Sequence, residues 1–597
     1  MGDLAISRAS FPLKAPQRDP DYLVMVYAGC NVGSLIDMSH PTEGSFRLLP
    51  DLKALAPRTA DGRVAFMVQG YEVSQAGQWE THRYLIQDGQ VTDQTDDIRG
   101  QGYQYPDHPP FQATGKAPAT GTQVSLFDKS SVEDFVRSSL THCARHTVFM
   151  LSSHGQPAPA FAGEALAHGQ RVNFQYEELL VSDFSQALQQ ADPTHRIELL
   201  DLNCCQMGKA ENALELAPVA PLILASQQDE AAPKDHATTD DFQDVPGACG
   251  ALLDRPDMTP EAFGKTIISD TEAKTRYQDP QQGEEDPIPT LTLYRTAGLS
   301  SVIQGLSAAG DALNPMLDDP QKKAALIKAA ESCFHYEDEV VDLQSFLAGA
   351  KVPLIDMAPA YVDGFRGQYM GTDYRQVSPF AAYLPHVPSQ DQLHTNWWAM
   401  RSERQPGADV NALMASILSS SPPPHDRKKW LMDQGQALNK LFSNLYVQYP
   451  EMLSVCPDAR LQASLQATTE RPLMDLQMSV DHVMMDILTH HLPPDQIDTQ
   501  VGTVHDQIQS LLKPWAEATK GVDFNAYLAR FDTAGGPKKL ADRMRASILT
   551  DARTEMAKPV AGYQGMASLP ESWKTFQKRF ADVLTDEVLP ARVAQLT

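Results

Sequence analysis

The chain has 597 residues, and its 49 lysine and arginine residues against 76 aspartate and glutamate residues give a net charge of −27 with histidine neutral. Hydrophobic residues make up 42% and charged residues 21%, an ordinary globular composition that excludes wholesale disorder. Because binding to nucleic acid or to an anionic membrane depends on a basic surface, the acidic balance argues against both as partners.

The cysteines and the N-terminus bear on compartment and cofactors. The seven cysteines include no CxxC pair, and their number is odd, so neither a disulfide framework nor a zinc ribbon is expected. Residues 1–21 carry charges and prolines where a signal peptide has an apolar segment, and no apolar run is long enough for a membrane span. We expect a cytoplasmic protein, with non-classical export as the alternative, and the residues predict no metal site and no cofactor.

In chain order, residues 1–20 are predicted to be an N-terminal tail, followed by short apolar runs separated by helical spacing. The apolar runs predict buried strands at 22–27, 64–68, 147–151, 196–200 and 221–225. The helical spacing predicts helices at 132–140, 176–190 and 210–216. This alternation is typical of a parallel sheet covered by helices on both faces, so the fold class is α/β over a domain of residues 21–280.

Composition changes divide the rest of the chain. The polar, proline-rich segment 278–289 predicts the end of the first domain, followed by an accessory region over 290–415 with helices at 299–313 and 322–332. The serine and proline run 419–424 predicts a linker. Amphipathic stretches such as 501–515 and 573–584 predict a helical C-terminal domain over 430–597, which is a candidate for binding a protein partner.

Two motifs that can carry chemistry follow neighbouring predicted strands. Ser153-His154-Gly155 follows the third strand and Asn203-Cys204-Cys205 follows the fourth, at the edge where open α/β sheets build their sites. An imidazole can activate a thiol as a nucleophile, and the N–H groups of Gly155 and Cys205 can form an oxyanion hole. Taken singly, each motif is also typical of an ordinary loop or of a buried structural cysteine.

These residues resemble the clostripain-like cysteine peptidases, relatives of caspases and gingipains. His154 precedes Cys205 by about 50 residues, which is the caspase spacing. Met207, Gly208 and Glu211 match the family's Cys-x-Met-Gly-x-x-Glu pattern and place the nucleophile at Cys205, with Cys204 as its structural neighbour. Further matches, over roughly residues 20–390, are at 27–31, 222–227, 258–261, 289–292, 341–343 and 378–385.

The resemblance implies a caspase-like, mostly parallel sheet flanked by helices, and a cysteine endopeptidase that uses the dyad His154 and Cys205 on a protein or peptide substrate. Basic-specific members carry an acid where this chain has Asn203, and Asp229 or Asp235 could replace its charge. Asn203, Asp229 and Asp235 are therefore the predicted substrate-binding residues, and cleavage after a basic residue stays open.

Two further expectations follow from the resemblance. Calcium dependence, known in some members, is implied by the resemblance alone, because no loop with EF-hand spacing of oxygen ligands is present. Asn203 and Cys30 depart from the family pattern and motivate a second hypothesis. In it the chain is a catalytically weakened, caspase-like scaffold that recruits a protein partner.

Overall fold

The structure is a computed structural model, and it describes residues 19–28, 48–73, 79–99, 124–165, 175–230, 243, 245–275, 277–279, 283–285, 290–337, 339–369, 372–388, 393, 410–422, 427–445, 494–518 and 536–596. The chain divides into two compact units. Unit 1 consists of Met1–His386 and Met556–Asp582, and unit 2 of Val387–Glu555 and Val583–Thr597.

Unit 1 contains a nine-stranded sheet among its described residues, in the order β16-β13-β10-β9-β5-β1-β2-β3-β4. The strands are β1 (Tyr22–Ala28), β2 (Val64–Val73), β3 (Trp79–Gln87), β4 (Gln90–Asp93), β5 (His146–Ser152), β9 (Ile197–Asn203), β10 (Leu222–Ala225), β13 (Thr290–Arg295) and β16 (Tyr361–Arg366). The central strands β10, β9, β5, β1 and β2 run parallel, and the outer pairs on each side are antiparallel. The predicted α/β class is confirmed.

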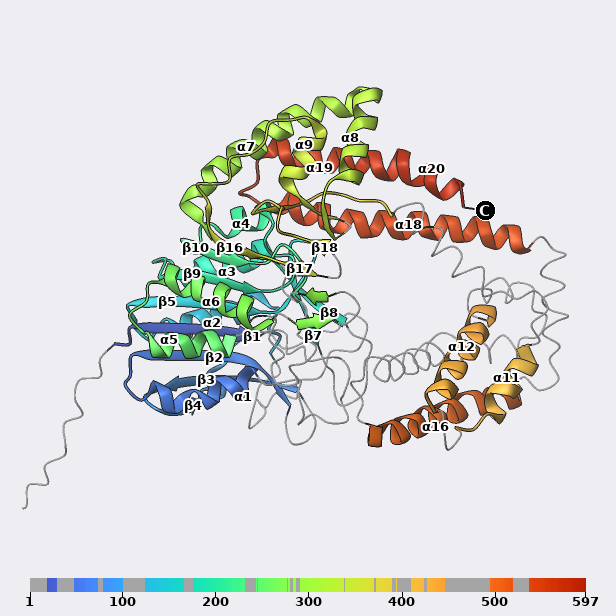
Figure 1. Cartoon of the computed structure of the whole chain (residues 1–597), viewed down its shortest axis with the longest axis horizontal. Helices are drawn as coiled ribbons and strands as arrows, with labels where there is room; N and C mark the ends of the chain where they lie inside the picture. The colour runs from blue at the N-terminus through green and yellow to red at the C-terminus, as the bar shows by residue number, and fades with distance from the viewer. Residues whose placement is uncertain are drawn as a thin grey trace, which may run out of the picture. The chain divides into compact units, whose positions relative to one another are not determined.

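Helices cover both faces of this sheet (Figure 1). On one face lie α1 (Leu48–Ala54), α5 (Val245–Asp254) and α6 (Pro260–Thr275); on the other lie α2 (Lys129–Ser139), α3 (Val181–Ala191) and α4 (Ala210–Leu216). Side chains alternate between the faces along each strand. On β5, Val148 joins the core under the first set of helices, while the Phe149 ring contacts Phe135 of α2 and Phe184 of α3. Burial on both faces explains why these strands are continuously apolar.

The remaining strands of unit 1 form small sheets. One of them, in the order β6-β7-β8, follows β5 directly and consists of β6 (His154–Gly155), β7 (Ala160–Ala165) and β8 (Gln175–Leu180). The others are β14 (His335–Glu337) with β15 (Val340–Asp342) and β19 (Ala381–Tyr383), and the hairpins β11 (Tyr277–Asp279) with β12 (Gly283–Glu285) and β17 (Gln368–Tyr369) with β18 (Thr372–Asp373). The helix predicted from 176 begins only at Val181, because residues 175–180 pair with β7 instead.

Further helices complete the two units. Unit 1 also holds α7 (Leu299–Leu313), α8 (Pro320–Ser332), α9 (Leu343–Ala350) and α19 (Glu571–Val583), whose last residue belongs to unit 2. The described part of unit 2 is helical, with α11 (Val410–Ser419), α12 (Arg427–Leu445), α16 (Pro494–Ala518) and α20 (Leu589–Ala594). Helix α18 (Gly536–Gly565) belongs to unit 2 up to Glu555 and to unit 1 from Met556. Among the residues that the structure describes, every helix is too short or too polar to span a lipid bilayer.

This division differs from the domain limits expected from the sequence. The segment 278–289 does not end the first unit, because β13, which follows it, pairs with β10 in the central sheet. Residues 556–582, expected in a separate helical domain, belong to unit 1. Trp573 of α19 is fully buried there and donates from Nε1 to Glu211 Oε1 at 3.0 Å. Long-range packing of this kind leaves no mark in local composition.

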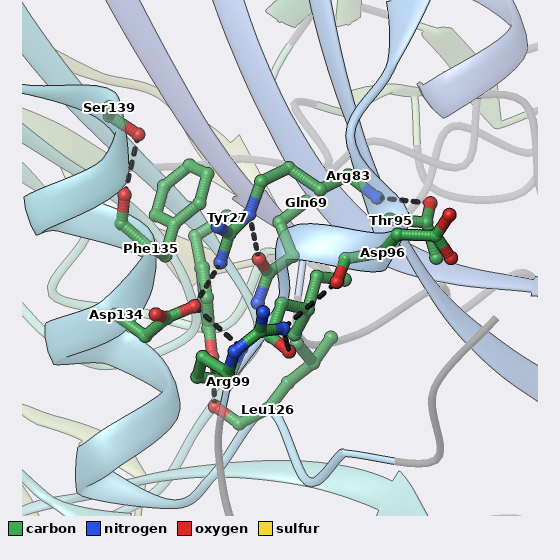
Figure 2. A network of polar contacts seen from close by, with 11 residues as sticks. Tyr27, Gln69, Arg83, Thr95, Asp96, Arg99, Leu126, Asp134, Phe135 and Ser139 are labelled. Carbon is green, nitrogen blue, oxygen red and sulfur yellow. Dashed lines mark hydrogen bonds and ion pairs between the residues drawn. The ribbon is translucent and has the colours of Figure 1, made fainter. Parts of the chain in front are cut away.

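A buried arginine joins the antiparallel side of the sheet to the helical layer (Figure 2). Arg83 of β3 is fully buried; its Nε donates to Gln69 Oε1 of β2 and its Nη2 to Asp134 Oδ2 of α2, each at 2.7 Å. The backbone N–H of Arg99 also donates to Asp134 Oδ2, at 2.9 Å. An ion pair with hydrogen bonds on both sides offsets the cost of burying the guanidinium. The network thereby connects β2, β3 and α2.

Candidate active site

Strands β5 and β9 are parallel neighbours, and each is followed at once by one of the two motifs. Ser152, the last residue of β5, is aligned with Asn203, the last residue of β9. The N–H of Ser153 donates to the carbonyl oxygen of Asn203 at 3.2 Å, so the alignment continues beyond the strands. The segments that lead to His154 and to Cys205 therefore leave the sheet side by side.

Gly155 lies directly against the backbone of Cys205. A Cβ atom at position 155 would stand 1.6 Å from the Cys205 carbonyl oxygen and 3.1 Å from its backbone nitrogen. No side chain fits into that space, so packing requires glycine at this position. The histidine and cysteine motifs are thus in contact.

His154 is held beside this contact by a short strand. With Gly155 it forms β6, and it pairs with Ala162 of β7. The side chain is partly buried; burial lowers the pKa of His154, and the negative charge of Asp229 acts against that shift. The imidazole is therefore neutral near pH 7 and able to accept a proton.

The two adjacent cysteines face different surroundings. The Cys204 thiol is fully buried and donates to a carbonyl oxygen of β5 at 3.6 Å, whereas the Cys205 sulfur accepts the backbone N–H of Glu230 at 3.3 Å. Burial raises the pKa of the Cys205 thiol, and the carboxylates of Asp229 and Glu230 raise it further. Backbone N–H groups of Glu230 and Gly155 oppose the shift. In this conformation the thiol is protonated and needs a base to become a nucleophile.

The turn after Cys205 is held against the end of β10. Gln206 has a φ of 56°, in the left-handed region, and its N–H donates to the Gln228 carbonyl oxygen at 3.1 Å. A Cβ at Gly208 would stand 2.9 Å from the backbone nitrogen of Gln227. The backbone of Gly208 therefore also lies too close to its neighbour for any side chain at this position. These contacts fix the position of Cys205 between the ends of β5 and β10.

Glu230 lies beside Cys205, and the charge of a second buried acid, Asp201, acts on the Glu230 carboxyl. Gln243 lies between them and Asn203: its Nε2 donates to Glu230 Oε1 at 3.2 Å, and its backbone N–H donates to Asn203 Oδ1 at 2.9 Å. Burial raises the pKa of Asp201 to about 8, an effect that Gln243 partly opposes. Burial also raises the pKa of Glu230 well above its ordinary value, and the charge of Asp201 adds to this. Asp201 therefore holds a proton near pH 7, and burial favours the protonated form of Glu230.

The residues predicted to bind substrate have different positions. Asn203 is fully buried with its side-chain oxygen engaged, while Asp229 is partly exposed and accepts from Gln206 Nε2 at 2.8 Å. Asp235 lies outside the described residues. Asp201 and Glu230 were missed by the sequence reasoning. A signal existed for Asp201, a charged residue between Leu200 and Leu202 of β9 and on the same strand face as Asn203.

The site contains few groups suited to a metal. Within the described ranges, no three His, Cys, Asp or Glu side chains are grouped so that they could hold a metal ion. Calcium dependence therefore stays a prediction from the family resemblance.

The similarity of the chain to known proteins is limited to solved structures. No model of a protein family matches the chain, and no curated protein matches it. Among solved structures the chain is similar to a secreted C11 cysteine protease from Bacteroides thetaiotaomicron in complex with an irreversible peptide inhibitor, with 12% identity, a TM-score of 0.39, and 63% of this chain and 96% of that chain covered. It is also similar to an inactive zymogen C11 protease from Parabacteroides distasonis, with 12% identity, a TM-score of 0.38, and 64% and 96% covered. The likeness is to clostripain-like cysteine proteases.

Proposed function

We propose that the protein is a cysteine endopeptidase in which Cys205 is the nucleophile and His154 the general base and acid. The observation that carries the proposal is the contact between Gly155 and Cys205, where a Cβ would stand 1.6 Å from the Cys205 carbonyl oxygen. This contact supports a site in which a histidine, a thiol and two backbone N–H groups act together at one edge of the sheet. Acyl transfer needs this combination of groups.

The reaction starts from a neutral pair. His154 accepts the thiol proton, and the Cys205 thiolate attacks the scissile carbonyl carbon. The N–H groups of Gly155 and Cys205 donate to the oxyanion as the tetrahedral intermediate forms. The imidazolium then protonates the leaving amine, and the C–N bond breaks to give a thioester. Water, deprotonated by His154, attacks the thioester and releases the acid, and the proton returns to the thiol.

The buried acids Asp201 and Glu230 support a preference for cleavage after lysine or arginine. Glu230 donates its N–H to the Cys205 sulfur, so its backbone lies beside the reacting atom, and Asp201 raises the pKa of the Glu230 carboxyl. A cationic side chain that reaches these acids would displace a proton and pair with the carboxylate left behind. Asp229, partly exposed next to the dyad, adds negative charge.

One observation favours the second hypothesis, a binding scaffold without turnover. The Cys205 thiol has a raised pKa and two carboxylates for neighbours, which disfavours the thiolate. His154, in the segment that contacts Cys205, can still accept the proton when substrate excludes water, which is why we prefer the peptidase.

A cleavage profile on a peptide library tests the proposal. Wild type, Cys205→Ala and His154→Ala are compared, and Cys204→Ala is the matched control because its thiol points into the protein beside β5. We expect turnover in wild type and Cys204→Ala, with basic residues before the cleaved bond, and none in the other two variants. Equal turnover in wild type and Cys205→Ala would disprove the peptidase.

A further inference from the structure

Lys209 is a buried lysine close to the proposed dyad, and within the described part of the chain its Nζ donates only to backbone oxygens. The residue is fully buried, immediately before α4, and its Nζ donates to the carbonyl oxygens of Gln156 at 2.6 Å and Pro157 at 3.2 Å. These are the two residues that follow Gly155. Lys209 therefore connects the chain after the cysteine to the chain after the histidine.

A second donor reaches the same carbonyl from the far end of the sequence. The hydroxyl of Tyr563, on α18, donates to the Pro157 carbonyl oxygen at 2.8 Å, across 406 residues of sequence. Both acceptor positions of that oxygen are thereby occupied. Gly562 packs beside it, since a Cβ there would stand 2.7 Å from Pro159 Cγ. Tyr563 itself is fully buried and stacked on Tyr383, with ring centroids 4.6 Å apart.

We propose that Lys209 and Tyr563 are positioning residues that hold residues 156 and 157 so that the Gly155 N–H stays aimed at the oxyanion. The inference rests on the proposed function. Oxyanion stabilisation depends on donors fixed within a fraction of an ångström, and an error of about 1 Å can cost about 100-fold in rate. Neither residue touches the reacting atoms.

The cost of burying Lys209 favours a positioning role over simple packing. Burial lowers the pKa of Lys209 to about 7, although Glu211, Glu339 and Asp229 act against the shift. An apolar side chain would fill the same space without this desolvation. What the ammonium adds is a pair of hydrogen bonds to the backbone next to Gly155.

The test compares two tyrosines that stack on each other. Tyr563→Phe removes the bond to Pro157, and Tyr383→Phe is the matched control, because the buried Tyr383 hydroxyl has no hydrogen-bond partner within the described residues. Lys209→Met removes the second donor and Lys209→Arg is the conservative rescue. For each variant kcat and KM are measured on a cleaved peptide, together with the rate at which iodoacetamide alkylates Cys205 and the thermal midpoint.

We expect kcat of Tyr563→Phe to fall about 10-fold, with KM, alkylation rate and thermal midpoint close to wild type, because only oxyanion alignment is lost. Tyr383→Phe should match wild type, and Lys209→Arg should retain more of kcat than Lys209→Met. If the wild type cleaves peptide but Tyr563→Phe and Tyr383→Phe have the same kcat, the positioning role is wrong and the peptidase stands. If wild type and Cys205→Ala are equally inactive, both proposals are wrong.

Discussion

Gly155 and Cys205 are in contact through their backbones, and the space between them has no room for a single methyl group: a Cβ at 155 would stand 1.6 Å from the Cys205 carbonyl oxygen. The contact joins two segments that follow adjacent parallel strands. It is the relationship on which the proposed chemistry depends, and it makes residue 155 the most sensitive position for substitution.

Gly155→Ala should therefore strongly reduce turnover, although the chain keeps both side chains of the dyad. The added methyl group forces the His154 segment away from Cys205, and we expect kcat/KM to fall at least about 100-fold. The matched control is Gly502→Ala in α16, where a Cβ meets nothing within 4 Å. Peptide hydrolysis by the two variants, with circular dichroism to check folding, makes the comparison. Normal turnover in Gly155→Ala would contradict the site geometry.

Asp201 should make the protein less stable as pH rises towards 8. Its pKa is 3.8 in the unfolded reference and about 8 when buried, so between these values the folded state holds a proton that the unfolded state has lost. Stability from this group is present in full below about pH 4 and is lost as pH rises through about 8. Asp201→Asn removes the effect, so its free energy of unfolding relative to wild type should rise by about 3 kcal/mol from pH 5 to pH 8.

Urea unfolding of both proteins at the two pH values measures this difference. Asp506→Asn is the control, because that carboxylate is 86% exposed. Parallel pH dependence of Asp201→Asn and wild type would show that Asp201 is not protonated in the fold.

The strands at the centre of the sheet were predicted from the sequence, whereas the buried acids Asp201 and Glu230 were not. The runs at 22–27 and 147–151 are continuously apolar because both faces of β1 and β5 are covered, and that signature is local. The segment 176–180 has helical spacing but forms β8, because β7 supplies hydrogen bonds that no local pattern reveals.

Only the part of the site that follows from the order of the strands could be predicted from the sequence. His154 and Cys205 could be paired because parallel strands end at one edge. Glu230 and Tyr563 could not, since their roles arise from contacts that cross between distant segments. Tyr563 meets Pro157 across 406 residues, and Glu230 reaches the Cys205 sulfur through its backbone, which carries no sequence signal.

Binding of a basic peptide should release protons. Asp201 holds a proton near pH 7 and burial favours the protonated form of Glu230, whereas pairing with a lysine or arginine side chain requires ionised carboxylates. We expect about one proton released per peptide at pH 7 when Cys205→Ala binds a lysine-containing peptide, and tighter binding as pH rises from 6 to 8. Calorimetry in two buffers with different ionisation enthalpies counts the protons.

The double variant that also carries Glu230→Gln should release fewer protons and bind the same peptide more weakly. A norleucine peptide should release none with either protein. Proton uptake, or equal affinity for the lysine and norleucine peptides, would exclude these acids as the recognition site.

Arg83 should be more important for stability than any exposed ion pair. Arg83→Met removes the hydrogen bond to Gln69 and the ion pair with Asp134, which keeps only the Arg99 N–H, and we expect a loss of about 3 kcal/mol in the free energy of unfolding. Arg375→Met is the control, since the pair Arg375–Asp373 lies at the surface and should leave the midpoint unchanged. Denaturant titration compares the unfolding midpoints of the two variants. Equal midpoints would mean that the network in Figure 2 does not contribute to the stability of the fold.

The proposed function depends on covalent chemistry at the Cys205 sulfur, assisted by the His154 imidazole. Its most direct measurement is mass-spectrometric mapping of the cysteine modified by a peptidyl acyloxymethyl ketone that ends in lysine. We expect label on Cys205 and not on the buried Cys204 or the exposed Cys143, and loss of the label in His154→Ala. Stronger labelling of the exposed Cys143 than of Cys205 would contradict the proposed mechanism. Labelling of Cys205 that persists in His154→Ala would contradict it as well.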